Sequence, residues 1–316
     1  MSKSLSEREE YAVKIVQMLP EGLREIVMSS GIPEAELREI RLRVGRGLII
    51  ETADGEKLLA KNGRSVRLET EAYRVTKEDI KTVLELFTGY SVYAFEEELR
   101  QGYFTVEGGH RIGVAGRAVT ENGRVLRMNY ISFLNIRIAH ECRNCSRELY
   151  NRLYGENRLY HTMIFAPAGC GKTTFLRDLI RLLSESGTRV GVADERSELA
   201  ASHHGIPQHD LGGRTDVMDG CPKAEAMQML LRSMTPQVLA ADEIGLPEDV
   251  LAIRAAAGSG CKVLASAHGG TLSEIQKNPM LRELWEERRF ERYVRLEKSK
   301  KGFGIKAIYD AEGVEL

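Results

Sequence analysis

One stretch of the chain has the residue types and spacing of a phosphate-binding loop. Residues 164–175 read I-F-A-P-A-G-C-G-K-T-T-F, an apolar lead-in, a glycine-rich turn and the start of an apolar-periodic segment. This pattern predicts a strand, a loop of free backbone N–H groups and a helix N-terminus, which together attract anions. In such a loop Lys172 reaches the β- and γ-phosphates of a nucleotide, and the Thr173 hydroxyl ligates Mg²⁺. The candidate phosphate-binding residues are Ala166, Pro167, Ala168, Gly169, Cys170, Gly171, Lys172, Thr173 and Thr174.

The loop departs from the usual pattern G-x-x-x-x-G-K-[ST] at its first position, where Ala166 replaces glycine. Glycine at that position serves the sharp exit from the strand, so Ala166 followed by Pro167 is expected to stiffen the loop. The alternative is a chance glycine-rich turn before a helix. Features further along the chain decide between the two interpretations.

Two predicted strands after the loop each end in carboxylates. Residues 189–193 lead into the acidic segment 194–198, and residues 238–241 lead into Asp242 and Glu243. The carboxyl ends of parallel strands meet at the ligand-binding edge of such a sheet, so these side chains are expected to lie together. A buried strand can end in an acidic turn by chance, but the order after a phosphate loop favours the functional interpretation.

These carboxylates suit a magnesium-dependent nucleotide hydrolase. Thr173 and Asp242 would place Mg²⁺, and Glu243 or Glu195 would orient the attacking water. His268 follows another predicted strand and is placed to sense the terminal phosphate.

The pattern of the chain changes near residue 140. At 316 residues the chain is long enough for two domains. Residues 1–140 predict a smaller α+β domain, a PAS-like antiparallel sheet with leading helices, in which Thr76 and Asp79 form a helix-capping box. Residues 158–316 alternate short apolar strands with helices, which predicts an α/β domain with a mostly parallel sheet. The polar residues 141–157 are predicted to link the two domains.

Composition excludes several classes of protein. The formal net charge of -1 gives no strongly basic surface, so no direct nucleic-acid partner is expected. No apolar run reaches the length of a membrane span, the N-terminus has no signal-like core, and five cysteines fit a reducing compartment. A cytoplasmic protein is expected. The lone C-x-x-C at residues 142–145 lacks the second pair of ligands that zinc needs.

Three arginines on the predicted antiparallel sheet leave two interpretations open. Arg111, Arg117 and Arg137 either belong to a solvated face or reach a phosphate, because a guanidinium suits that contact.

An ordered set of motifs between Arg41 and Glu297 closely resembles the stage III sporulation protein AA family of endospore-forming bacteria. That family is similar in turn to the secretion-type ATPases of type II and type IV export and pilus assembly. The motifs are R-L-R-V-G-R, S-V-Y-A, G-G-H-R-I-G-V-A-G-R, L-N-I-R-I-A, A-P-A-G-C-G-K-T-T-F-L-R-D, D-E-R-S-E, D-G-C-P-K, R-S-M-T-P, A-D-E-I-G and S-A-H-G. The resemblance implies a RecA-like P-loop NTPase domain that binds ATP and Mg²⁺.

The resemblance also implies roles for residues and partners. Residues 194–198 would form the acidic box, residues 242–245 the Walker B segment, and His268 the histidine box. A hexameric ring is implied, in which arginines of one subunit complete the site of the next. The candidate arginines are Arg111, Arg117, Arg196, Arg214 and Arg232. The implied role is to energise a channel between mother cell and forespore, at the membrane, through membrane proteins of the same operon.

The chain departs from the secretion motors at Asp242, which replaces the glycine before the Walker B glutamate. The choice of water-activating carboxylate among Glu195, Glu198 and Glu243 therefore stays open, as does the choice between ATP and GTP. A nucleotide-gated scaffold with little turnover is the alternative function. A small-molecule kinase is less favoured, since no lid or acceptor motif is found.

Overall fold

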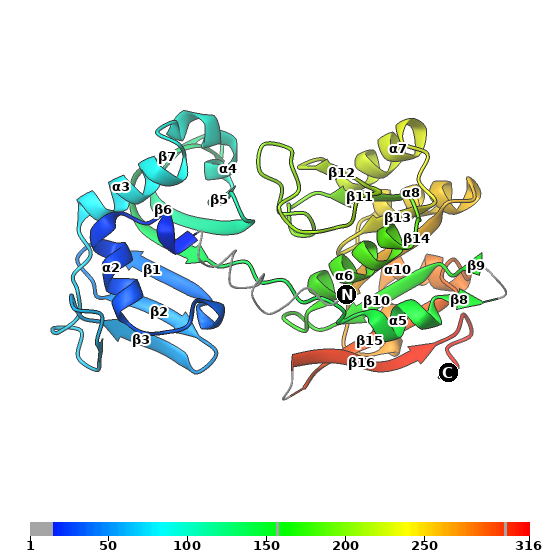
Figure 1. Cartoon of the computed structure of the whole chain (residues 1–316). Helices are drawn as coiled ribbons and strands as arrows, with labels where there is room; N and C mark the ends of the chain where they lie inside the picture. Colours follow the sequence, from blue (N-terminus) through cyan, green and yellow to red (C-terminus); the bar gives the residue numbers. More distant parts are fainter. Residues whose placement is uncertain (1–14, 156–157, 300–301) are drawn as a thin grey trace. The chain divides into compact units, whose positions relative to one another are not determined.

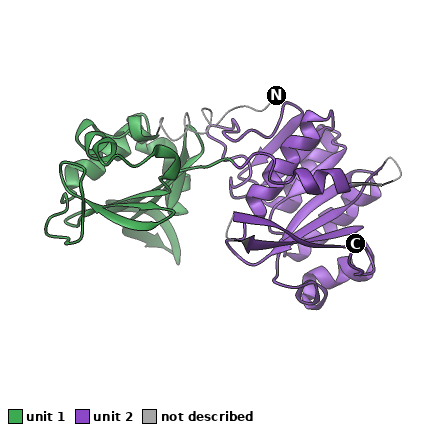
Figure 2. Cartoon of the chain, turned by 60° about the horizontal axis from the view of Figure 1, so that its bottom comes forward, with its two compact units in different colours: residues 1–141 green, residues 142–316 purple. Residues whose placement is uncertain are grey.

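The computed structural model of the chain describes residues 15–155, 158–299 and 302–316. The chain divides into two compact units, residues 1–141 and residues 142–316 (Figures 1 and 2). Each unit contains a seven-stranded sheet and hydrophobic core of its own. The first part of the predicted leading helices, residues 5–14, lies outside the described residues.

The first unit is built on an antiparallel sheet. Its strand order is β4-β3-β2-β1-β7-β6-β5, and every pair of neighbours is antiparallel. The strands are β1 (Glu39–Arg43), β2 (Leu48–Thr52), β3 (Gly55–Leu59), β4 (Ser65–Val66), β5 (Tyr103–Val106), β6 (His110–Glu121) and β7 (Arg124–Arg137). The strands β5, β6 and β7 pair in chain order, while β7 also pairs with the early strand β1.

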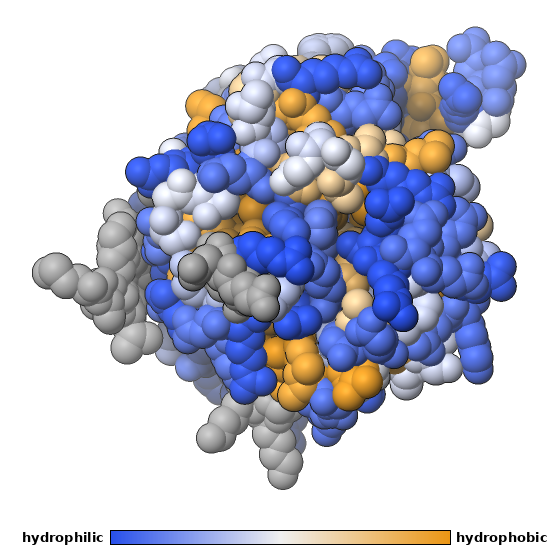
Figure 3. Space-filling view, turned by 90° about the vertical axis from the view of Figure 1, so that its right-hand side faces the viewer, coloured by the Kyte–Doolittle hydropathy of each residue, from blue (hydrophilic) through white to orange (hydrophobic). Residues whose placement is uncertain are grey.

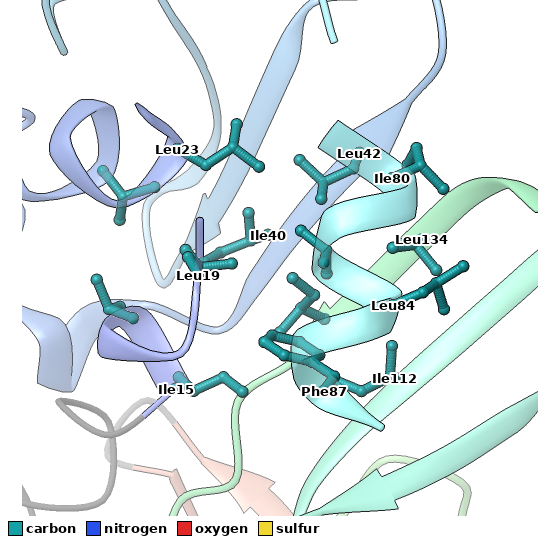
Figure 4. Packing of buried hydrophobic residues seen from close by; sticks show 14 of the residues in the cluster. Ile15, Leu19, Leu23, Ile40, Leu42, Ile80, Leu84, Phe87, Ile112 and Leu134 are labelled. Carbon is teal, nitrogen blue, oxygen red and sulfur yellow. The ribbon is translucent and has the colours of Figure 1, made fainter. Parts of the chain in front are cut away.

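One face of this sheet is apolar and the other is charged, as the alternation of β1 predicts. Ile40 and Leu42 are buried, whereas Arg41 points to the opposite face and forms ion pairs with glutamates of β1, β2 and β3. Figure 4 shows Leu84 and Phe87 of the helix α3 close to this apolar face. Full burial of such a side chain contributes about 1.5–3 kcal/mol to folding.

Besides the helical residues 15–17, the described part of this unit contains three helices and two short 3₁₀ turns. They are α2 (Glu21–Ser29), α3 (Lys77–Phe87), α4 (Glu96–Arg100) and the turns Glu34–Glu36 and Val92–Phe95. The predicted capping box at α3 is confirmed. The Asp79 N–H donates to Thr76 Oγ1 at 3.1 Å, and the Thr76 N–H donates to Asp79 Oδ2 at 2.8 Å.

The second unit is built on a mostly parallel sheet with the order β12-β11-β13-β14-β10-β15-β16. All neighbours are parallel except β15 and β16, which form a C-terminal antiparallel hairpin. The strands are β10 (Thr162–Ala166), β11 (Val190–Asp194), β12 (Thr215–Asp219), β13 (Val238–Ala241), β14 (Lys262–His268), β15 (Arg292–Ser299) and β16 (Gly302–Tyr309), beside a small ribbon of β8 (Tyr154–Gly155) and β9 (Arg158–Leu159).

Helices cover both faces of the parallel sheet. The helices α5 (Arg147–Arg152) and α6 (Lys172–Glu185) pack on one face. The other face carries α7 (Lys223–Ser233), α8 (Pro247–Gly258), α9 (Leu272–Lys277) and α10 (Pro279–Glu286). Strands buried on both sides need apolar residues at every position, which explains the continuous apolar runs of β10, β11 and β13.

Part of the segment predicted as a linker, residues 141–157, packs into the core of the second unit. Leu149 and Leu153 are fully buried in the core under α6. The Asp178 carboxylate of α6 accepts hydrogen bonds from the Asn144 N–H at 2.9 Å and from the Ser146 N–H and hydroxyl at 2.9 and 2.8 Å. From residue 142 onward the segment therefore belongs to the second unit.

One face of the molecule is largely polar. Figure 3 shows a face on which hydrophilic residues dominate and hydrophobic residues form only small separate areas. Among the helices of the described ranges, none combines the length and the apolar character needed to cross a bilayer.

Candidate nucleotide-binding site

The phosphate loop stands at the carboxyl end of β10, whose five residues are all buried. Gly169 and Gly171 have φ of 72° and 79°, a region that suits glycine and turns the chain sharply into α6. Gly171 is the N-cap residue of α6, and no side-chain hydrogen bond caps this helix start. Its first backbone N–H groups are therefore free to bind an anion.

Lys172 is buried beside the loop, with 5% of its surface exposed. Its Nζ donates to the carbonyl oxygens of Ala166 at 3.2 Å and Pro167 at 3.4 Å. No carboxylate forms an ion pair with Lys172 among the described residues. A buried ammonium that has only neutral partners favours an added anion such as a phosphate.

Thr173 and Asp242 meet at the base of the site. Thr173 Oγ1 donates to Asp242 Oδ2 at 2.5 Å. Ser266, fully buried on β14, donates its hydroxyl to the other carboxylate oxygen and accepts the Glu243 N–H at 2.9 Å. A hydroxyl and a carboxylate are hard oxygen ligands of the kind that Mg²⁺ prefers. In the described chain no three His, Cys, Asp or Glu side chains gather closely enough to hold a metal ion.

Glu243 occupies a strained position after β13. Its φ of 50° is uncommon for a residue other than glycine. The Ser266 hydroxyl and carbonyl, which bind the N–H groups of Glu243 and Ile244, maintain this conformation. The exposed Glu243 carboxylate forms an ion pair with Arg196 at 3.3 Å. Strain of this kind, about 1–3 kcal/mol, concentrates at functional sites.

Asp194 shapes the acidic segment that follows β11. Its buried carboxylate accepts hydrogen bonds from the N–H groups of Glu198, Leu199 and Ala200 at 2.7–3.2 Å. Burial raises the pKa of Asp194, and these hydrogen bonds oppose the shift. Arg177 of α6 donates to the carbonyls of Glu198 and Leu199, which ties the acidic segment to the helix that starts at the phosphate loop.

Glu195 forms an ion pair with Lys223 at 2.9 Å, and the Lys223 side chain is 9% exposed. Lys223 belongs to the motif D-G-C-P-K, to which the sequence analysis assigned no role. A pocket that is partly open to solvent lies here. It is lined by Ala193, Asp194, Glu195, Arg196, Glu198, Lys223, Asp242 and Glu243. The two acidic strand ends thus share one pocket.

His268 ends β14 beside the phosphate loop. It is exposed and pairs in register with Ala166 of β10. Nearby, Glu274 accepts the Gly270 N–H at 2.8 Å, and this hydrogen bond lowers the pKa of the Glu274 carboxyl. The Arg295 side chain of β15, whose buried Nε has no hydrogen-bond partner among the described residues, contributes to the same shift.

The candidate arginines lie at different places. Arg196 is next to Glu243 at the carboxyl ends of the strands. Arg214 directly precedes β12 and so lies at the amino end of that strand. Arg232 is exposed in the last turn of α7, about 13 Å along the helix axis from Lys223.

Two candidate arginines belong to the first unit, both on β6. The Arg111 guanidinium lies 3.4 Å from the centre of the Tyr103 ring, and Arg117 is exposed.

Several residues of the site were not found from the sequence. Ser266 and Lys223 were inside quoted motifs, which was the only signal available for them. Arg177 was also inside a quoted motif, the one that contains the phosphate loop, whereas Arg295 carried no signal because its contacts depend on packing between distant segments.

Comparison with known proteins identifies the family. The family described as "Sporulation stage III, protein AA" matches residues 8–316. The Stage III sporulation protein AA of Bacillus subtilis (strain 168) is 42% identical over 308 residues, which is 95% of this chain and 95% of that protein. This chain belongs to the stage III sporulation protein AA family. The predicted resemblance is confirmed.

Solved structures confirm the predicted fold of this family member. The Legionella pneumophila ATPase DotB superposes with a TM-score of 0.53 at 14% identity, covering 90% of this chain and 78% of that one. The pilus retraction motor PilT with bound ADP gives 0.54 at 14% identity, covering 90% of this chain and 81% of that one. The chain has the RecA-like α/β fold of these ATPases, preceded by an α+β unit. At such identities the likeness establishes the fold alone.

Proposed function

We propose that this member of the stage III sporulation protein AA family is a magnesium-dependent ATPase that works as a secretion-type motor. One observation carries the proposal: the Thr173 hydroxyl and the Asp242 carboxylate meet at 2.5 Å beside the loop that holds Lys172. This brings an anion site and a magnesium-type oxygen pair to the same strand ends.

Each part of the site has a distinct task in binding. The amides from Gly169 to Thr174 and the Lys172 ammonium hold the phosphates. Thr173 and Asp242 would hold the magnesium ion, which would neutralise charge on the phosphates. Ser266 keeps the Asp242 carboxylate in place, since it donates to the oxygen that Thr173 does not use.

Glu243 is the better candidate to orient the attacking water. Glu195 is engaged with Lys223, a nearly buried ammonium. Glu243 pairs with Arg196, whose side chain is 64% exposed, and such a pair is weak. We expect Glu243→Gln to abolish hydrolysis while ATP still binds, and Glu195→Gln to leave measurable turnover.

The role in the cell follows from the family and belongs to the same proposal. We propose a ring of six subunits that energises a channel between mother cell and forespore through membrane proteins. Motors of the same fold, such as the PilT retraction motor, support the idea of a mechanical role. An arginine from a neighbouring subunit would stabilise charge in the transition state, with Arg232 among the candidates.

Phosphate release by the full chain tests the ATPase proposal. With ATP and Mg²⁺ we expect turnover by the natural sequence and none by Lys172→Ala, because the variant lacks the only cation buried in the loop. GTP in a parallel reaction determines the preferred base. Equal turnover by Lys172→Ala would refute the site.

A nucleotide-gated scaffold is the second candidate function. The observation that favours it is the loop itself, where Lys172 donates hydrogen bonds to the Ala166 and Pro167 carbonyls of its own chain. A scaffold would assemble with ATP and Mg²⁺ yet release no phosphate with or without membrane partners. Mass measurement in solution, with and without ATP and Mg²⁺, shows whether nucleotide builds the ring.

A further inference from the structure

The C-terminal hairpin places an aromatic ring directly over the phosphate loop. A Cβ atom added to Gly171 would lie 2.5 Å from Cγ and Cδ1 of Phe303, the second residue of β16. The Phe303 side chain therefore packs on the loop backbone. It also packs against the core cluster under α6, yet the residue is only half-buried, so part of it stays open to solvent.

The position of the hairpin determines which end of a nucleotide it would meet. The strand β10 lies between β14 and β15. Asp242 and His268 stand at the ends of β13 and β14. They mark the side of β10 on which Mg²⁺ and the terminal phosphate would bind. A nucleotide whose γ-phosphate points toward those residues extends its base toward the opposite side of β10, where β15 and β16 lie.

We propose that Phe303 is the platform on which the base of the bound nucleotide stacks. The inference rests on the proposed nucleotide site and adds the residue that recognises the base. A flat, apolar and partly open ring next to the loop suits this contact, because an aromatic face stacks on any nucleobase. Phe303 lies outside the loop and the acidic segments, so no sequence motif of the site includes it.

Binding of two ligands to the full chain separates base recognition from phosphate recognition. The probes are ATP and inorganic tripolyphosphate, which has no base, each with Mg²⁺. We expect Phe303→Leu, which keeps an apolar side chain against Gly171, to weaken ATP binding about tenfold and to leave tripolyphosphate binding unchanged. Phe303→Tyr keeps the aromatic face and should bind both ligands as the natural sequence does.

Two results would overturn the inference. Phe303→Leu that binds ATP normally shows that the ring does not touch the base. Equal loss for both ligands shows that the ring only supports the loop.

Lys172→Ala separates the failure of this inference from the failure of the proposed function. We expect this variant to bind neither ATP nor tripolyphosphate measurably. If the natural sequence binds neither ligand, the nucleotide site itself is wrong. If the natural sequence binds both and Phe303→Leu leaves ATP affinity intact, only the role of Phe303 is wrong.

Discussion

The two units contain sheets of the same strand number that use their polar residues differently. In the antiparallel sheet of the first unit, charges are spread over one face, where Arg41 pairs with glutamates of three strands. In the parallel sheet of the second unit, Thr173, Asp242 and Glu195 gather at one edge. Parallel strands end on the same side, so their carboxyl ends concentrate chemistry that an antiparallel sheet distributes.

Two glycines with the same backbone conformation give the largest expected contrast between the units. Gly171 and Gly123 have φ of 79° and 76°. A Cβ at Gly171 would collide with Phe303, whereas one at Gly123 meets nothing within 4 Å. We expect Gly171→Ala to weaken ATP binding at least about a hundredfold, because the loop amides must shift. Calorimetric titration with ATP and Mg²⁺ measures the loss.

Gly123→Ala is the matched control in the first unit. It should cost about 1 kcal/mol of stability from backbone strain and leave ATP affinity unchanged. Equal effects of Gly171→Ala and Gly123→Ala on ATP binding would contradict the claim that the nucleotide site belongs to the second unit alone.

Two buried serine–aspartate pairs within the second unit give a smaller contrast. Ser266 donates to Asp242 at the site, and Ser146 donates to Asp178 where α6 meets the preceding segment. Alanine at either position should cost about 1 kcal/mol of stability. Only Ser266→Ala should slow phosphate release, about tenfold, since Asp242 and the Glu243 amide lose their common partner. A similar slowing by Ser146→Ala would show that the defect is one of packing.

The contacts predicted from the sequence are those made by residues close together in the chain. The capping box joins Thr76 and Asp79, and the phosphate loop is one continuous segment. The ends of β11 and β13 were predictable because each strand is an apolar run that is followed directly by acidic residues. The α/β order of the second unit was predictable for the same reason, because each strand and helix carries its own periodicity.

The unpredicted contacts join distant segments of the chain. The salt bridge between Glu195 and Lys223, the hydrogen bond from Ser266 to Asp242 and the packing of Phe303 on Gly171 arise only when the sheet assembles. The burial of residues near the start of the second unit has the same cause. Leu149, in a short polar helix, is buried because α6 lies against it.

A variant in the capping box of α3 tests whether ATP binding depends on the stability of the first unit. Thr76→Ala removes the hydroxyl that accepts the Asp79 N–H, and we expect a loss of about 1 kcal/mol. Faster amide hydrogen exchange in residues 77–87 would report it. ATP affinity should be unaffected, and a drop in affinity would mean that the first unit supports the nucleotide site directly.

His161 gives a pH dependence of the stability of the second unit. Its Nδ1 accepts the Val263 N–H at 3.2 Å, and burial, followed by the charge of Lys262, lowers the pKa of His161 from 6.5 to about 4. Between these values the unfolded chain binds a proton that the folded chain does not. Stability should therefore fall as the pH drops through this window.

The variant His161→Gln isolates this contribution. It cannot titrate, so the difference in melting temperature between the natural sequence and the variant should narrow from pH 7 to pH 4. A difference that stays constant over that range would show that His161 titrates normally in the folded chain.

The central claim is that the hydroxyl of Thr173 and the carboxylate of Asp242 serve one magnesium–nucleotide complex. The direct measurement is ATP affinity with and without Mg²⁺ for the natural sequence, Thr173→Val, Asp242→Asn and the double variant. We predict that each single change removes the gain in affinity due to Mg²⁺ and that the double change removes no more. Losses that simply add, or a single variant that keeps the full gain, would contradict the shared site.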